Sequence, residues 1–201
     1  MITLAFDTCL DKMYVVLKND DVILASQIVE NQDNKYHSAF LISTIQKVLS
    51  ENNIKPKDIN LIAVNVGPGS FTGIRACVTV ARVMAQQLTC KAVGVSSLEI
   101  LSKIANKNSL VALDARKDSA YLFYNGEIKG AVRLDDVKEI IKNGDYSVIT
   151  DDKLQPIIGG KSYQQGKYPL GEILADIAEN KNAEGNWRKL KPLYIQPPPG
   201  I

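Results

Sequence analysis

Two short segments of this 201-residue chain carry the residue types that could do chemistry. The first is Asp7-Thr8, where a carboxylate and a hydroxyl follow an apolar run that is typical of a buried strand. The second is Gly67-Pro68-Gly69-Ser70-Phe71-Thr72-Gly73, which joins another apolar run to a long helical pattern. Backbone N–H groups in a glycine-rich loop at the start of a helix can bind a phosphate, so a phosphate or nucleotide site is one hypothesis for these segments.

The glycine-rich loop has a structural interpretation as well, and the sequence leaves both open. It lacks the lysine of the P-loop motif, and Thr72 stands where the dinucleotide-binding motif needs a glycine. Its glycines would equally allow close packing in a tight turn from strand to helix, with Ser70 or Thr72 as the helix cap. The residues that would form the phosphate or nucleotide site are Asp7, Thr8, Gly67, Gly69, Ser70, Thr72 and Gly73.

Metal-ligating and nucleophilic side chains are sparse. The only histidine is His37, which is expected at the start of a helix, and the three cysteines, Cys9, Cys77 and Cys90, have no metal-binding spacing. We therefore predict no metal ligand, no catalytic residue and no cofactor bound by this chain alone. The odd number of cysteines and the lack of a secretory signal predict a reducing, cytoplasmic location, and no apolar run approaches the length of a membrane span.

The composition is typical of a globular protein. Hydrophobic residues make up 45% of the chain and charged residues 23%, a balance that favours a folded domain over a disordered one. The formal net charge of +2 is too small to indicate nucleic-acid binding by itself.

The hydrophobic pattern predicts a β-β-β-α-β-α-β order in the first half of the chain, and a similar order begins again in the second half. Short links between the first three strands imply antiparallel pairing and helical crossovers imply parallel pairing, so the first sheet is mixed. We predict two lobes, 1–102 and 103–201, of which the second is reduced and ends in an irregular tail. The predicted strands are 2–6, 13–17, 22–29, 61–66, 110–113, 120–124, 128–133 and 147–150, and the predicted helices are 37–50, 74–88, 135–142 and 171–180.

Several short segments of the sequence resemble the TsaB family, also called YeaZ. The most specific is the glycine-rich loop with its preceding strand. Further matches are Phe6-Asp7-Thr8, His37-Ser38, Asp114-Ala115-Arg116 and Pro192-Leu193-Tyr194-Ile195, and all follow the order of the family. The resemblance implies the two-lobed α/β, ribonuclease H-like fold of the actin/hexokinase/heat-shock ATPase superfamily, with a mixed five-stranded sheet in the first lobe.

In function, the resemblance implies a non-catalytic scaffold subunit of the complex that transfers a threonylcarbamoyl group to N6 of the adenosine just after the anticodon in tRNAs reading ANN codons. TsaB proteins pair with and activate the catalytic subunit TsaD, and the ATPase TsaE completes the complex. The resemblance further implies contact with tRNA through the complex, room for ATP or ADP at the boundary between subunits, and a homodimer as the alternative assembly of the isolated chain. The catalytic relatives hold a metal with two histidines, and one histidine cannot supply that pair.

The resemblance assigns the partner interface to the first two helices. A helical wheel of 37–50 places Leu41, Ile45, Val48 and Leu49 toward the sheet with Ile42 at their margin, and it places Phe40 on the opposite, outer side. The second helix is apolar on more than one side, so it is either buried by its own fold or shares a side with another chain. The interface candidates are Phe40, Thr44, Lys47, Ala76, Val80 and Val83.

Two other functions stay open as alternatives. An ATP-dependent small-molecule kinase of the same superfamily would need a phosphate-binding hairpin in each lobe. Its acidic pair could only be Asp7 and Asp114, and neither has a glycine-rich hairpin beside it. A self-associating regulatory protein without a connection to tRNA is the second alternative. Unlike the scaffold subunit that the resemblance implies, it would need no TsaD-like partner.

Overall fold

The structure is a computed structural model that describes residues 1–30, 37–105, 108–181 and 185–195. The chain forms two compact units. The first contains Met1–Ser97 and Pro169–Leu193, and the second contains Leu98–Tyr168 and the residues from Tyr194 onward. Among the described residues, no helix combines the length and the apolar character needed to cross a membrane.

The first unit is built on a mixed five-stranded sheet in the order β3-β2-β1-β4-β5. The three strands joined by short turns pair antiparallel, and β4 and β5 pair parallel because a helix precedes each of them. The sheet comprises β1 (Ile2–Asp7), β2 (Met13–Asn19), β3 (Val22–Val29), β4 (Leu61–Asn65) and β5 (Lys91–Val95).

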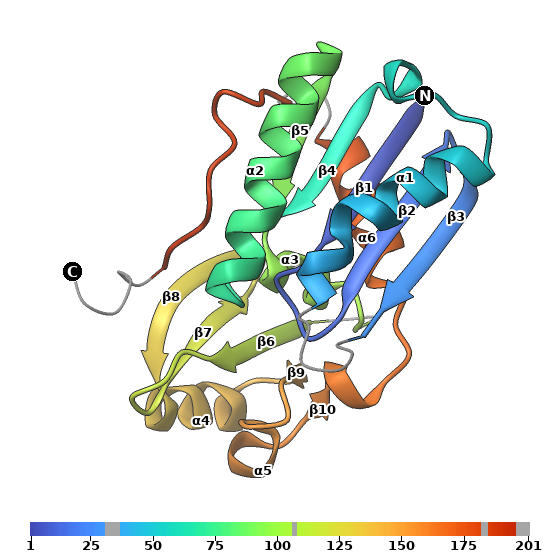
Figure 1. Ribbon diagram of the computed structural model, residues 1–201. Coiled ribbons are helices and arrows are strands. Elements are labelled where there is room, and N and C mark those ends of the chain that lie inside the picture. The colour runs from blue at the N-terminus through green and yellow to red at the C-terminus, as the bar shows by residue number, and fades with distance from the viewer. Residues whose placement is uncertain (31–36, 106–107, 182–184, 196–201) are drawn as a thin grey trace. The chain divides into compact units, whose positions relative to one another are not determined.

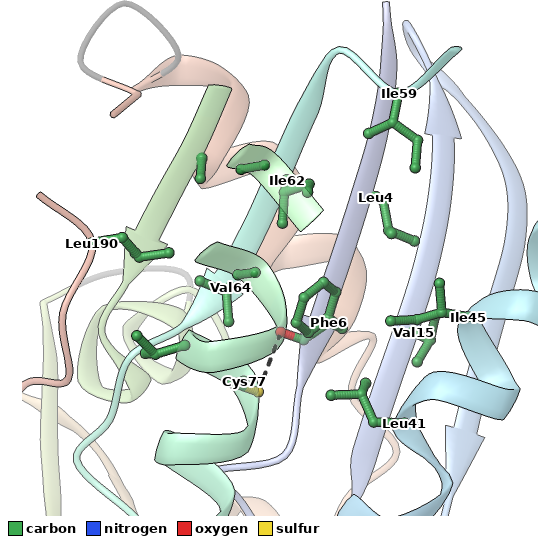
Figure 2. Close-up of a cluster of buried hydrophobic side chains, with 14 of the residues drawn as sticks. Leu4, Phe6, Val15, Leu41, Ile45, Ile59, Ile62, Val64, Cys77 and Leu190 are labelled. Atoms are coloured by element: carbon green, nitrogen blue, oxygen red, sulfur yellow. Dashed lines mark hydrogen bonds between the residues drawn. The ribbon is translucent and has the colours of Figure 1, made fainter. Parts of the chain in front are cut away.

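Two helices cover one face of this sheet, α1 (Leu41–Glu51) and α2 (Phe71–Leu88), and a 3-10 turn, His37–Phe40, leads into α1. Their apolar sides meet alternate residues of the strands in one core, which Figure 2 shows from close by. The core includes Leu4, Phe6, Val15, Leu41, Ile45, Ile62, Val64 and Cys77. A short 3-10 turn, Pro56–Asp58, precedes β4.

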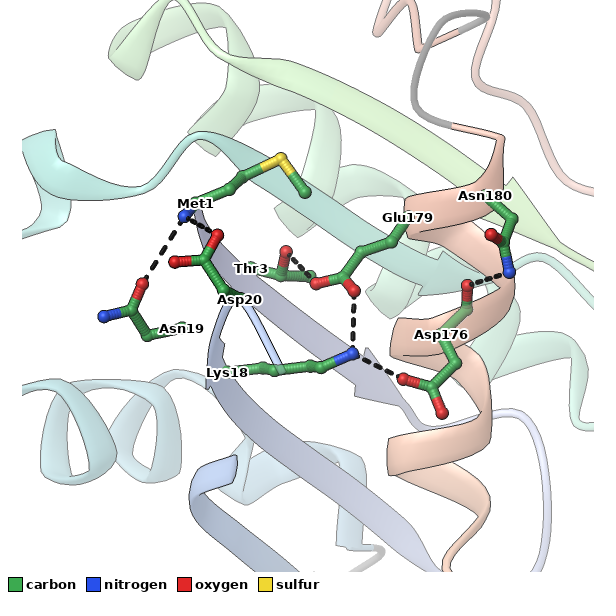
Figure 3. A network of polar contacts seen from close by, with 8 residues as sticks. All are labelled: Met1, Thr3, Lys18, Asn19, Asp20, Asp176, Glu179 and Asn180. Atoms are coloured by element: carbon green, nitrogen blue, oxygen red, sulfur yellow. Dashed lines mark hydrogen bonds and ion pairs between the residues drawn. The ribbon is translucent and has the colours of Figure 1, made fainter. Parts of the chain in front are cut away.

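The structure corrects the predicted boundary between the lobes, because a helix from the last part of the chain belongs to the first unit. Helix α6 (Leu170–Asn180) packs on β1, β2, β4 and β5, on the face away from α1 and α2 (Figure 1). The buried side chain of Lys18 reaches Asp176 Oδ1 at 2.6 Å and Glu179 Oε2 at 2.7 Å, and Thr3 Oγ1 donates to Glu179 Oε1 (Figure 3). The first sheet therefore needs α6 to cover its second face and to neutralise its buried lysine.

The second unit repeats the strand arrangement of the first. Its sheet has the order β10-β9-β6-β7-β8, with β6, β7 and β8 antiparallel and β9 and β10 parallel to β6 and β9, respectively. The last strand has only two residues, in agreement with a reduced second lobe. Its elements are α3 (Ser97–Ser102), β6 (Ser109–Asp114), β7 (Ser119–Tyr124), β8 (Glu127–Arg133), α4 (Leu134–Asn143), β9 (Ser147–Thr150), α5 (Gln155–Ile158), β10 (Lys161–Ser162) and a 3-10 turn, Tyr163–Gln165.

This repeated arrangement is the ribonuclease H-like fold of the actin/hexokinase/heat-shock ATPase superfamily, which confirms the predicted fold class. The second core is separate and contains Leu110, Ala112, Ala120, Leu122, Val137 and Leu154.

Candidate functional site

The glycine-rich loop lies against the turn that follows β1. Ser70 N donates to Cys9 O at 2.8 Å, and Thr8 Oγ1 donates to Gly73 O at 2.7 Å. A Cβ atom on Gly69 would lie 2.3 Å from Cys9 O, and one on Gly73 would lie 1.8 Å from Thr8 O. Real Cβ atoms do not approach a backbone oxygen so closely, so both glycines are needed for contact with the chain's own backbone.

Ser70 caps helix α2, as one of the two predicted caps. Its Oγ accepts from Gly73 N at 3.2 Å, and the helix begins at Phe71, three residues before the predicted start. Thr72, the other predicted cap, lies inside the first turn and is exposed. The phosphate-binding interpretation of this loop stays a prediction, now with a packing role established for two of its glycines.

Replacing Ser70 with alanine is expected to lower the free energy of unfolding by about 1 kcal/mol, the usual cost of losing a serine cap. The exposed Thr72 offers a matched control, since Thr72→Ala removes a hydroxyl from the same turn without removing the cap. Urea unfolding followed by circular dichroism would measure both. Equal stability of the two variants would contradict a capping role for Ser70.

A buried polar network fixes the first residue of the loop. Asp7 accepts from Cys9 N at 2.6 Å and from Asn65 Nδ2 at 2.9 Å, while Asn65 Oδ1 accepts from Gly67 N at 2.8 Å and from Ser97 Oγ at 2.9 Å. Burial raises the pKa of the Asp7 carboxyl, and the hydrogen bonds from Asn65 and Cys9 oppose this rise. Asn65 was missed from the sequence, although a polar residue within an apolar strand was a signal that could have found it.

The fold also brings together residues that no sequence spacing connects. Cys9 and Cys77 are buried next to Asp7, and the two Sγ atoms and a carboxylate oxygen all lie within 4.8 Å of one another. Thr8 N donates to Cys77 Sγ at 3.1 Å, and Cys9 Sγ donates to Asn65 O at 3.2 Å. Burial raises the pKa of the Cys9 thiol, and the neighbouring Cys77 and Asp7 raise it further.

The helix face predicted as an interface is exposed in part, and the structure corrects the position of one residue. Phe40 is half-buried and packs against the core, whereas Ile42, expected at the margin of the sheet-facing side, is 51% exposed. Phe40 lies in the 3-10 turn, where the rotation per residue differs from that of an α-helix, so an α-helical wheel places it wrongly. The predicted core residues of α1 are buried: Leu41, Ile45, Val48 and Leu49.

On α2, Val83 is 54% exposed, which agrees with the predicted position of its side chain. Ala76 and Val80 are half-buried, and Val80 also packs against the core. Phe71, at the start of the same helix, is 41% exposed, and the Arg75 guanidinium lies 3.9 Å from the centre of its ring. Of the two remaining interface candidates, Thr44 is half-buried and Lys47 is exposed.

Two other candidate residues belong to other elements of the chain. His37 belongs to the 3-10 turn before α1. Asp114, at the end of β6 in the second unit, lies 3.1 Å from the Lys153 ammonium and accepts from Arg116 N at 2.8 Å.

Comparison with known proteins identifies the family of the chain. Residues 23–143 match the family model of TsaD, tRNA N6-adenosine threonylcarbamoyltransferase. The tRNA threonylcarbamoyladenosine biosynthesis protein TsaB of Bacillus subtilis is 31% identical over 163 residues, which cover 74% of this chain and 69% of that protein. TsaB of Buchnera aphidicola subsp. Schizaphis graminum is 34% identical over 125 residues, which cover 60% of this chain and 58% of that protein.

The match is partial in length in a third relative as well. TsaB of Escherichia coli is 32% identical over 123 residues, and the chain spans about half, 52%, of its length. Among solved structures, YeaZ from Pseudomonas aeruginosa has the same fold, with a TM-score of 0.77 at 22% identity over 96% of this chain and 100% of that one. Sequence and fold agree, and the chain belongs to the TsaB (YeaZ) family.

Proposed function

We propose that the protein is a subunit of the machinery for tRNA threonylcarbamoyladenosine biosynthesis. In this machinery it binds a TsaD-type catalytic subunit and activates it. The names of its TsaB relatives support the pathway. The match of residues 23–143 to the TsaD family supports the partner, since two proteins built on one fold can pair through equivalent faces.

The exposed apolar side of α1 and α2 is the observation that carries the proposal. Ile42 and Val83 are both more than half exposed on two helices that cover the same face of the sheet. Half-buried Ala76 and Val80 lie on the same helix as Val83, and small side chains let a second helix approach closely. A partner that packs on this side would remove the exposed isoleucine and valine from water.

The residues that a superfamily ATPase would use on its substrate are engaged within this chain. The Asp7 carboxyl group is buried and accepts hydrogen bonds from Cys9 N and Asn65 Nδ2. The backbone of Cys9 and Thr8 occupies the space next to Gly69 and Gly73, respectively. This favours a non-catalytic subunit over a small-molecule kinase.

In the proposed complex, the TsaD-type partner would carry out the transfer and a TsaE-type ATPase would hydrolyse ATP. ATP or ADP would bind at the boundary between subunits. The role implies contact with tRNA through the complex and a location in the cytoplasm.

The test compares how strongly the wild type and variants of the exposed apolar side of α1 and α2 bind a TsaD-type protein. Ile42→Asp combined with Val83→Asp is expected to weaken binding at least about tenfold, because a charge in the centre of an apolar contact must be desolvated. The matched control is Val22→Asp, which places the same charge at a 61% exposed valine on strand β3. Co-elution and isothermal titration would measure the effect, and unchanged binding by the double variant would contradict this interface.

The same proteins distinguish the alternative functions. Transfer to tRNA is expected only when TsaD-type and TsaE-type partners are both present. ATP turnover by the isolated chain that is lost in Asp7→Ala would instead support the kinase alternative. A mass measurement that finds a homodimer, together with no binding to a TsaD-type protein, would support the self-associating regulator.

A further inference from the structure

The end of β1 and the middle of α2 bring three metal-ligating side chains together inside the first unit. Cys9 and Cys77 are far apart in the sequence, and Asp7 and Cys9 lie at the edge of a turn. In the fold, both Sγ atoms and an Asp7 oxygen lie within 4.8 Å of one another. The three residues are at most 2% exposed, so the protein encloses the cluster.

The surrounding groups hold these side chains in position. Thr8 N donates to Cys77 Sγ at 3.1 Å, and Thr8 Oγ1 lies 3.0 Å from the same sulfur. Asn65 Nδ2 donates to Asp7 Oδ2 at 2.9 Å. Hydrogen bonds of this kind to ligand atoms are what orients the ligands of a metal ion.

The surroundings of the Asp7 carboxyl group are the second observation that points to a cation. Within the described part of the chain, no lysine, arginine or histidine forms an ion pair with this buried carboxylate. Burial opposes ionisation of this carboxyl group unless a positive charge compensates it. A cation bound between the carboxylate and the two sulfurs would supply that charge.

We propose that Asp7, Cys9 and Cys77 bind a thiophilic divalent cation of the zinc class, which has a structural role in the first unit. Two thiolates favour zinc over magnesium or calcium, and three protein ligands leave one position of a tetrahedral ion for a backbone oxygen or a water. Each thiol releases its proton to solvent as it binds, so one ion displaces two protons. This departs from the sequence prediction of no metal ligands, which considered spacing along the chain.

A bound ion would connect two parts that the glycine-rich loop already holds together. It would join the end of β1 to α2, next to the contacts of Gly69 with Cys9 and of Gly73 with Thr8. The site therefore adds stability to this loop and does not add catalytic chemistry. The competing explanation is that both cysteines are ordinary core residues, which free cysteines often are.

Cobalt is the probe that distinguishes these explanations, because Co²⁺ replaces Zn²⁺ and absorbs visible light. Reduced, metal-free protein is titrated with Co²⁺, both in the folded state and during refolding from urea, since the site is enclosed. The expected result is one ion per chain, with sulfur-to-cobalt charge-transfer absorption and the visible bands of a tetrahedral ion. Equimolar Zn²⁺ should abolish the bands and raise the melting temperature of the protein.

Three variants locate the ion. Cys77→Ala and Asp7→Asn should reduce the affinity for Co²⁺ by at least tenfold, whereas Cys90→Ala should leave it unchanged because Cys90 lies outside the cluster. Circular dichroism shows whether each variant is folded. Absence of the bands in the wild-type protein under both conditions, or bands that persist in Cys77→Ala or disappear in Cys90→Ala, would overturn the proposal without reference to any partner or to tRNA.

Discussion

Replacing Gly73 with alanine is expected to lower the free energy of unfolding by about 3 kcal/mol or more, through overpacking against a backbone that cannot move aside. The added Cβ would lie 1.8 Å from Thr8 O and 2.7 Å from Thr8 C. Relief requires the turn after β1 to separate from α2, and that separation would also break the hydrogen bond from Thr8 Oγ1 to Gly73 O.

The expected loss of stability is opposite in sign to the usual effect of this substitution in a helix. Glycine to alanine inside a helix ordinarily stabilises a protein by about 1 kcal/mol, because alanine has the higher helix propensity. Thermal and urea unfolding of Gly73→Ala, with the neighbouring exposed Thr72→Ala as control, would measure the difference. A Gly73→Ala protein as stable as the wild type would show that the loop does not need this close approach.

Removal of the Lys18 ammonium is expected to destabilise the first unit by about 2 kcal/mol, since Glu179 would lose the cation that compensates it. The estimate is below the usual cost of breaking a buried pair because the other partner, Asp176, is 61% exposed. Lys18→Met keeps most of the aliphatic volume, so loss of packing contributes little. Lys12→Met is the matched control, because the Lys12–Glu30 pair lies at the surface.

The same ion pairs predict a dependence on pH. Burial works to lower the pKa of Lys18, but its hydrogen bonds with Asp176 and Glu179 outweigh this effect, so the pKa is raised overall. A lysine whose folded pKa exceeds its unfolded pKa contributes stability that is fully present below the unfolded value and is lost as pH rises through the folded one. The stability difference between wild type and Lys18→Met should therefore persist at neutral pH and shrink in strongly alkaline solution. A difference that grows with pH there would contradict this account.

Much of the local structure follows from the sequence because it depends on neighbouring residues. The predicted strand 22–29 and the observed β3 coincide, since a segment rich in valine and isoleucine that follows a short polar turn specifies a strand without reference to distant parts. The predicted start of the second helix is late by three residues. Its apolar pattern begins at Ile74, but the helix begins after the serine that caps it, at Phe71.

The candidate site is where distant contacts overrule local pattern. Phe40 is half-buried and not on the outer side, because it lies in the 3-10 turn that precedes α1. The last helix joins the first unit because the second face of that sheet, with Lys18 in it, needs an apolar and acidic cover. Neither effect can be read from the spacing of residues along the chain.

The sequence alone was enough to predict the fold class, the family resemblance and most of the strands and helices, because these depend on hydrophobic periodicity and on local motifs such as the glycine-rich loop. The short elements α3, α5 and β10 were not predicted. What these motifs contact became visible in the folded protein. In the structure, Gly69 and Gly73 lie against the backbone of Cys9 and Thr8, respectively, and Asp7, Cys9 and Cys77 lie side by side. The physical reason is that burial and close approach are properties of pairs of segments, which meet only when the chain has folded.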